Sequence, residues 1–174
     1  YRSHGISRDK SLMTKEPDGD WYYQQINLGF NYRMNELQAA LGLNQMQRLD
    51  EFVSKRHNLQ ERYDSFLGYF PLKMPYQDKD SYSSLHLYPI QIDLNRVSKD
   101  RNEIYNELRN KGVGVNVHYI PIHTQPYFSK FGFKEGDFPN SENYYQNAIS
   151  LPLFHHMTIK QQDFIISAID KILN

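Results

Sequence analysis

Two short segments carry side chains whose types and spacing could do chemistry. In the first, Asn31 and Arg33 stand directly before a pattern typical of a helix that begins near Asn35. The N-terminus of a helix presents free N–H groups and the positive end of the helix dipole, so polar side chains there could help to bind an anion such as a phosphate. Ordinary capping of the helix uses the same residue types. The residues alone leave both interpretations open.

The second segment is Asn116-Val117-His118-Tyr119, at the end of a predicted strand and the start of a loop. Ligands of α/β proteins gather at strand ends. His118 could bond a phosphate or a ribose hydroxyl, or transfer a proton near neutral pH. Tyr119 offers a hydroxyl group and a stacking face. In the alternative interpretation, His118 is a strand residue that bonds only to its neighbours.

The histidines do not predict a metal site. His118 and His123, like the pair His155-His156, lack a closely spaced carboxylate as a third ligand, and no helical HExxH spacing occurs. A glycine-rich phosphate loop, a serine-triad order and a dinucleotide fingerprint are also missing from the sequence. The chain has no cysteine, which excludes a disulfide scaffold, a thiolate zinc site and a cysteine nucleophile.

Length and charge narrow the remaining classes. The 174 residues are enough for one domain with a hydrophobic core. Lys+Arg and Asp+Glu both count 20, and this balance argues against a nucleic acid or an anionic membrane as partner. No apolar run approaches the roughly 20 residues that a membrane helix needs. Because the chain begins with Tyr1 in the middle of a pattern, we expect it to be part of a longer protein.

A long helix, expected from Asn35 to about Leu67, must position the first segment. Asn35 can cap it together with Gln38, and an apolar stripe at helical spacing follows. Gly42 inside this pattern suggests that another backbone approaches closely. Gly68 is the expected stop.

Strands and helices alternate through the rest of the chain, which predicts an α/β layer with a small sheet covered by helices. The second segment lies at the end of one of these strands. Strands are expected over 85–92, 113–118 and 149–153. Helices are expected from Asp100 to Gly112, from Ser141 through Ala148, and from Thr158 to the C-terminus.

Four blocks, in their order along the chain, closely resemble the DegT/DnrJ/EryC1/StrS family of pyridoxal-phosphate-dependent nucleotide-sugar aminotransferases. The most specific is Asn31-Tyr32-Arg33-Met34, inside the second block. Within the family, the opening Arg2 to Ile6 and the segment Asn116 to Pro121 look most like the transaminases of pseudaminic acid synthesis. The four blocks are Ser3–Ile6, Leu28–Gly42, Val117–His123 and Ser150–Leu153.

The resemblance implies an α/β fold: the C-terminal small domain of a fold type I aminotransferase, preceded by a long interface helix. Residues 1–30 would be a loop or the end of the large-domain region, and residues 31–174 the small domain. The implied activity is amino transfer, usually from glutamate, to the 4-keto carbon of a UDP-sugar. A 3-keto sugar and a dTDP-sugar stay open.

Site residues follow from the same resemblance. Asn31 matches the asparagine that reaches the phosphate of pyridoxal 5'-phosphate in the second subunit of a homodimer. Asn116, Val117, His118 and Tyr119 match a segment that contacts the nucleotide sugar, with Val117 contributing only backbone or packing. The Schiff-base lysine is expected upstream of residue 1, so no catalytic residue is assigned and the isolated chain is expected to be inactive.

The implied partners are therefore a UDP-sugar, an amino-acid donor and a second subunit, in the cytoplasm. The alternative is a non-catalytic module for binding or dimerisation, or a regulatory member of the same family.

Overall fold

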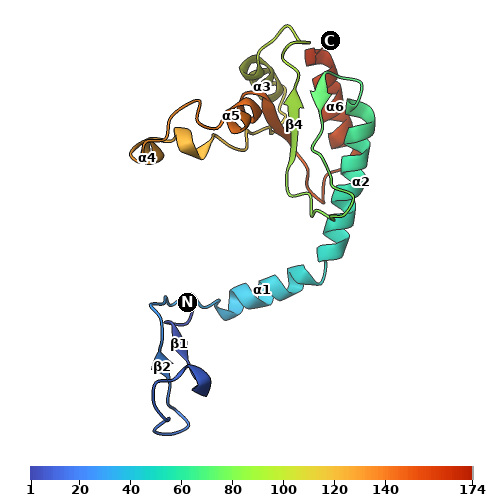
Figure 1. Cartoon of the computed structure of the whole chain (residues 1–174). Helices are drawn as coiled ribbons and strands as arrows, with labels where there is room; N and C mark the ends of the chain where they lie inside the picture. The colour runs from blue at the N-terminus through green and yellow to red at the C-terminus, as the bar shows by residue number, and fades with distance from the viewer. Residues whose placement is uncertain (174) are drawn as a thin grey trace. The chain divides into compact units, whose positions relative to one another are not determined.

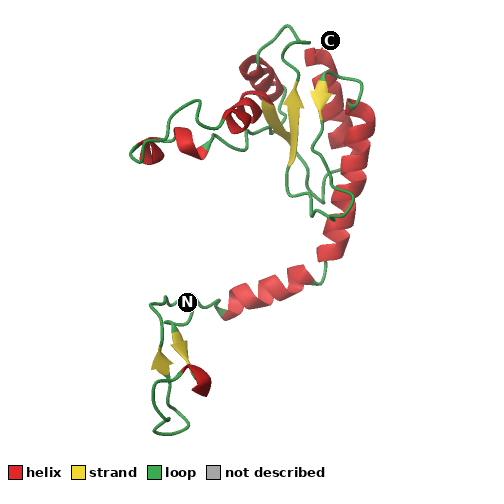
Figure 2. Ribbon diagram, viewed as in Figure 1, coloured by secondary structure: helices red, strands yellow, loops and turns green. Residues whose placement is uncertain are grey.

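The computed structural model describes residues 1–173 and separates into two compact units, Tyr1–Leu49 and a unit that begins at Asp50. Figure 1 follows the elements along the chain, and Figure 2 marks helices and strands. This division differs from the predicted domain boundary after residue 30, which concerns the whole protein and stays a prediction. No helix among residues 1–173 is both long and apolar enough to span a membrane.

The first unit holds a minimal sheet in which β1 (Ile6–Ser7) pairs antiparallel with β2 (Gln24–Gln25). The 3-10 helix η1 (Lys10–Leu12) lies in the loop between them. A second set of backbone hydrogen bonds ties the start of the chain to the approach to α1: the Phe30 N–H donates to the Tyr1 carbonyl at 2.7 Å, and the Tyr32 N–H donates to the Arg2 carbonyl at 2.9 Å. The segment around Asn31 is therefore held by backbone bonds on both sides.

Two glycines allow this close pairing. Gly5 has φ +70°, and a Cβ atom there would lie 1.9 Å from the Asn27 carbonyl oxygen. A Cβ atom on Gly29 would lie 2.1 Å from the Gly5 nitrogen. No side chain fits at either distance, because the atoms in the way belong to the backbone. Both glycines are thus required by the loop that leads to Asn31.

Helix α1 (Glu36–Met46) begins with the predicted capping box: the Gln38 N–H donates to the Asn35 side chain at 2.9 Å, and the Asn35 N–H donates to the Gln38 side chain at 3.1 Å. None of its residues is buried. Among the described residues, nothing lies within 4 Å of a Cβ atom built on Gly42. The close approach of another backbone to this glycine stays a prediction.

The expected single helix from Asn35 to Leu67 is wrong in one respect, because the structure breaks it into α1 and α2 (Leu49–Leu67). The last turn of α1 tightens where the Arg48 N–H donates to the Gln45 carbonyl at 3.1 Å, an i→i−3 bond of the 3-10 type. No glycine or proline marks the position, and the apolar stripe runs through it. The end at Gly68 is confirmed.

The second unit is built on an antiparallel sheet of order β3-β4-β5. Its strands are β3 (Leu72–Lys73), β4 (Tyr88–Ile92) and β5 (Ala148–Leu151). Ile90 pairs with Ile149, whereas Leu72 pairs with Ile92. Pro89 pairs only on the β5 side, since β3 reaches no further than Gln91. The proline thus occupies a local edge, as expected of a residue without an N–H group.

The predicted strand over 113–118 is not a strand. One isolated bridge joins Asn116 to Ser150, with N–H···O distances of 3.3 and 2.8 Å. The alternating pattern has another cause, which is the burial of Val113 and Val115 in the core. The segment therefore lies beside β5 while its later residues remain free to form a loop.

Helices α2, α3 (Arg101–Asn110), α5 (Pro139–Asn147) and α6 (Ile159–Leu173) flank the sheet in the second unit, whereas the short helix α4 (Pro126–Ser129) lies away from it (Figure 2). A 3-10 helix, η2 (Ile122–Thr124), precedes α4. The Asp100–Glu103 capping box and the cap formed by Thr158 and Gln161 are confirmed. The helix expected at Ser141 begins two residues earlier, at Pro139, because proline suits the first helical position.

The core of the second unit lies between α2, the sheet, α3 and α6. Gln162 of α6 is fully buried and donates to the Leu59 carbonyl of α2 at 2.7 Å. The Tyr63 and Tyr88 rings stack at 5.0 Å between α2 and β4, and burial raises the pKa of both phenols. Buried apolar side chains come from every layer, including Leu67, Tyr88, Leu108, Ile149 and Ile169.

Candidate functional site

Asn31 lies in the first unit with an exposed side chain that makes no hydrogen bond to residues 1–173. Its backbone bridges to Ser3. The Phe30 and Tyr32 rings stack at 5.0 Å, so alternation along the extended segment places Asn31 on the opposite face. The capping of α1 belongs to Asn35. Of the two interpretations, capping of α1 is therefore not the role of Asn31, and the binding of an anion stays a prediction.

The segment Asn116–Tyr119 lies in the second unit and is fixed at its centre. The His118 Nδ1 atom lies 2.8 Å from the Ser150 hydroxyl oxygen, and its Nε2 atom lies 3.4 Å from the Asn116 side-chain nitrogen. The Val117 N–H donates to the Asn116 side chain at 2.8 Å. The orientation of the imidazole is thus set by side chains of its own unit.

Tyr119, unlike the half-buried Val117 and His118, is open to solvent. Its ring meets the His118 ring edge-on at 4.6 Å, and the residue is 68% exposed. Val117 is half-buried and donates only its backbone N–H, which fits the expectation that it serves by backbone or packing. A phenol held on one side and free on the other can stack on a ring or bond to a polar group of a ligand.

Ser150 contacts the candidate segment, and the sequence did not predict this contact. It is 5% exposed within β5. Its backbone forms the bridge to Asn116, and its hydroxyl group holds the His118 ring. In the sequence it belongs to a predicted strand and opens one of the four blocks that resemble the family, but neither pattern gave it a role in the site. The signal that could have found it is a hydroxyl group between the apolar residues Ile149 and Leu151, since a buried hydroxyl requires a partner.

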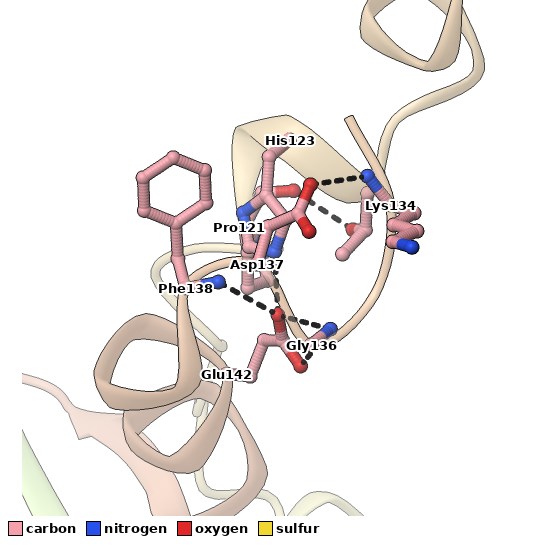
Figure 3. Close-up of polar contacts among 8 residues, drawn as sticks. Pro121, His123, Lys134, Gly136, Asp137, Phe138 and Glu142 are labelled. Atoms are coloured by element: carbon pink, nitrogen blue, oxygen red, sulfur yellow. Dashed lines mark hydrogen bonds and ion pairs between the residues drawn. The ribbon is translucent and has the colours of Figure 1, made fainter. Parts of the chain in front are cut away.

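A second polar cluster follows the segment and joins η2 to α5 (Figure 3). The His123 Nε2 atom donates to the Glu142 carboxylate at 2.6 Å, and both side chains are largely buried. The same carboxylate accepts from the Gly136 N–H at 2.9 Å and from the Phe138 N–H at 3.4 Å. His123 carried no predicted role and Glu142 was not singled out, because residues 19 positions apart meet only in the folded chain.

The hydrogen bond from His123 is the largest cause that lowers the pKa of Glu142 below its usual 4.5; the Gly136 and Phe138 amides lower it further, while burial opposes them. A carboxyl group with a depressed pKa stabilises the fold above its ordinary pKa, and this contribution is lost as the pH falls through the depressed value. We therefore expect Glu142 to titrate below 4.5, and His123→Ala to raise the midpoint. NMR titration of carboxyl-labelled glutamate measures both, and an unchanged midpoint in the variant would contradict the assignment.

The remaining histidines show no metal centre. Within the part of the chain that the structure describes, no three His, Cys, Asp or Glu side chains gather as a ligand set. The His155 and His156 ring centroids lie 4.0 Å apart with the rings tilted by 45°, and His155 also packs on Phe52 at 3.8 Å.

Comparison with known proteins relates the sequence of this chain to sugar aminotransferases. The chain is 37% identical over 98% of its length to the spore coat polysaccharide biosynthesis protein SpsC of Bacillus subtilis, covering 44% of that protein. It is 31% identical over 99% of its length to the UDP-4-amino-4,6-dideoxy-N-acetyl-beta-L-altrosamine transaminase of Campylobacter jejuni, covering 43% of it. The chain thus spans less than half the length of these relatives.

Solved structures give the same result. Helicobacter pylori PseC, an aminotransferase involved in the biosynthesis of pseudoaminic acid, superposes with a TM-score of 0.81 at 26% identity, over 99% of this chain and 44% of PseC. The putative sugar aminotransferase Spr1654 of Streptococcus pneumoniae, in its PLP form, gives a TM-score of 0.79 at 26% identity, over 99% of this chain and 42% of Spr1654. Spr1654 is also known in a PMP form. The expected small-domain fold and the expected cofactor are confirmed at the level of the family.

The family model for the DegT/DnrJ/EryC1/StrS aminotransferases matches residues 1–170. With nearly the whole chain inside the match, this chain belongs to the DegT/DnrJ/EryC1/StrS aminotransferase family, whose members depend on pyridoxal phosphate.

Proposed function

We propose that the full-length protein transfers an amino group from an amino acid, with glutamate as the expected donor, to the 4-keto carbon of a UDP-sugar in pseudaminic acid biosynthesis. The observation that carries this proposal is the family match over residues 1–170. The names of the Campylobacter and Helicobacter relatives support the sugar and the pathway. We further propose a homodimer in the cytoplasm, a compartment compatible with a chain that has no cysteine.

The residues of this chain fit a role beside the cofactor. Pyridoxal phosphate supplies the electron sink that allows an amino group to be transferred from the donor to the acceptor. Asn31 would hold its phosphate, since the side chain is exposed, has unused N–H donors and precedes the N-terminus of α1. We propose that it does so for the second subunit. We propose that residues 1–30 belong with the large domain and that residues 31–174 form the small domain. The isolated chain would be inactive because the Schiff-base lysine that the family uses is expected outside it.

The nucleotide sugar would be bound by the segment Asn116–Tyr119. His118 is held by Ser150 and therefore presents its ring in one orientation, and Tyr119 presents an exposed phenol beside it. A group fixed before the ligand arrives loses less entropy on binding. These residues would orient the sugar nucleotide, while the carbon that receives the amino group lies against the cofactor.

Asn31→Ala in the full-length protein is expected to weaken pyridoxal phosphate binding by about tenfold or more, because a hydrogen bond to a charged group contributes roughly 1.5–3 kcal/mol. Asn31→Asp should weaken it further, since a carboxylate repels the phosphate. Asn44→Ala, which removes an exposed amide from α1, is the matched control and should leave the affinity unchanged. Cofactor titration followed by absorbance measures all three, and equal affinities would count against the role of Asn31.

The reaction itself is tested by incubating the full-length protein with pyridoxal phosphate, glutamate and a UDP-4-keto sugar. The expected product is the aminated UDP-sugar, identified by mass, together with 2-oxoglutarate. A protein that binds cofactor and forms dimers but yields no aminated sugar with UDP- or dTDP-linked substrates would instead favour the regulatory or binding role.

A further inference from the structure

The largely buried carboxylate of Glu142 contacts two parts of the loop that follows the proposed sugar-binding segment. The side chains of His123 and Glu142 are 8% and 15% exposed, and their Nε2 and Oε1 atoms are 2.6 Å apart. Glu142 also accepts from the Gly136 N–H through both carboxylate oxygens, at 2.9 and 3.0 Å. Figure 3 shows these contacts converging on Glu142. The carboxylate therefore joins two parts of the loop, η2 and the turn before α5.

Glu142 does more than cap its own helix. Phe138, the residue before α5, makes no side-chain capping bond, and Glu142 in the first turn accepts from the Phe138 N–H instead. A negative charge at this end of a helix is favourable. The bond to His123 is not needed for capping, because η2 lies outside α5. The His123 ring also packs on the Phe138 ring at 4.8 Å, which fixes the direction from which it reaches Glu142.

The segment between the two polar clusters is held at both ends by one scaffold. At its start, His118 is bonded to Ser150 of β5, and at its end His123 is bonded to Glu142 of α5. Helix α5 continues directly into β5 at Ala148. Between the anchors, Tyr119 and Ile120 are 68% and 50% exposed. Residues 119–122, of which Pro121 is buried, thus form a strap between the two anchors.

We propose that His123 and Glu142 are a positioning pair that sets the conformation of residues 119–122 and thereby places Tyr119 for binding of the nucleotide sugar. This rests on the proposed function, since it assigns a ligand to the strap. Neither member of the pair touches the ligand; both act through the strap. A single hydrogen bond contributes only modestly to net stability, so the value of the pair here is geometric.

The test uses the full-length protein and the variants Glu142→Gln, His123→Ala and His123→Gln. Glu142→Gln keeps the size of the side chain but removes its charge. We expect the KM for the UDP-sugar to rise about five- to tenfold while kcat stays within about twofold, because the interaction lost is made equally in ground and transition state. His123→Gln should restore part of the affinity lost in His123→Ala, since its amide N–H can donate to Glu142.

Asp137→Asn is the matched control. Asp137 accepts from the Lys134 N–H at 2.9 Å in the same turn, but it makes no bond to η2. It should therefore leave the KM unchanged. Hydrogen exchange supplies a readout that is independent of activity. The Thr124 and Gln125 amides, which donate to the Pro121 and Ile122 carbonyls at 3.1 and 3.0 Å, and the Gly136 and Phe138 amides, which donate to Glu142, should exchange about tenfold faster in Glu142→Gln than in the unmodified protein.

The outcomes separate the two proposals. Faster exchange together with a raised KM supports the positioning pair. Faster exchange with an unchanged KM would make the pair merely structural and overturn the proposal, and so would unchanged exchange in Glu142→Gln. If the unmodified protein binds no UDP-sugar in a calorimetric titration, the proposed function fails and the ligand role of the pair fails with it. The exchange rates then still show whether the pair holds the strap.

Discussion

Replacing Gly29 with alanine is expected to destroy the geometry of the loop that carries Asn31 and to lower the affinity of the full-length protein for pyridoxal phosphate by about a hundredfold. The new Cβ atom would lie 2.1 Å from the Gly5 nitrogen and 2.4 Å from the carbonyl carbon of His4. Backbone atoms cannot move aside as the end of a flexible side chain can. Overpacking of this kind costs about 1–3 kcal/mol or more, and a loss of about 2.7 kcal/mol is about a hundredfold in affinity.

The pairing that the alanine disrupts is the one that fixes Asn31. The Phe30 N–H to Tyr1 carbonyl bond and the Tyr32 N–H to Arg2 carbonyl bond lie directly on either side of it. Gly114→Ala is the control, because no atom of the described residues lies within 4 Å of the place that its Cβ atom would take, and its φ is not in the left-handed region. Titration with pyridoxal phosphate measures the effect, and a Gly29→Ala protein that binds the cofactor as tightly as the unmodified one would show that the loop tolerates the displacement.

Features that depend on neighbours in the sequence could be predicted here. The capping boxes at Asn35 and Asp100 need only a side chain and an amide three residues away, and both are present as expected. The turn at Gly112, with φ +86°, follows from the freedom of glycine. Such contacts form within a single helical turn, so the sequence contains all the information they require.

Features that depend on packing could not be predicted. Alternation over Val113 and Val115 arises from burial against the core, yet only Asn116 bridges to β5. The break between α1 and α2 coincides with the division between the two units, where the buried stripe begins at Phe52. No local signal marks it. A pattern of apolar residues reports which side chains avoid water, and two different backbones can satisfy the same pattern.

The candidate site likewise contains residues that the sequence could predict and residues that only the folded structure reveals. Asn116, His118 and Tyr119 could be singled out because a histidine and a tyrosine at the end of an apolar run suggest a ligand. Their supports could not, since Ser150 lies 32 positions from His118, and Glu142 lies 19 positions from His123. Residues that hold a site residue in place can be found only from their contacts in the folded structure. Two adjacent residues of β5, Ile149 and Ser150, allow the effect on stability and the effect on the site to be measured separately.

Adjacent side chains of β5 point to opposite faces of the sheet, so Ile149 and Ser150 separate stability from binding. Ile149 is fully buried in the core and pairs with Ile90. Ile149→Ala is expected to lower the free energy of unfolding by about 2–5 kcal/mol through lost apolar contact and an incompletely filled cavity. Ile149→Val, which removes one methylene, should cost only about 0.5–1.5 kcal/mol. Urea unfolding of the full-length protein measures both.

Ser150→Ala should affect binding of the UDP-sugar more than it affects the stability of the fold. It removes the hydroxyl that holds the His118 Nδ1 atom at 2.8 Å but keeps the backbone bridge to Asn116. We expect a loss of only about 1 kcal/mol in unfolding free energy, together with a severalfold higher KM for the UDP-sugar, because the imidazole is no longer held in one orientation. Ile149→Val, in contrast, should leave the KM unchanged. If both variants changed stability and KM in the same proportion, β5 would support the site only by being folded, and the specific role of Ser150 would be wrong.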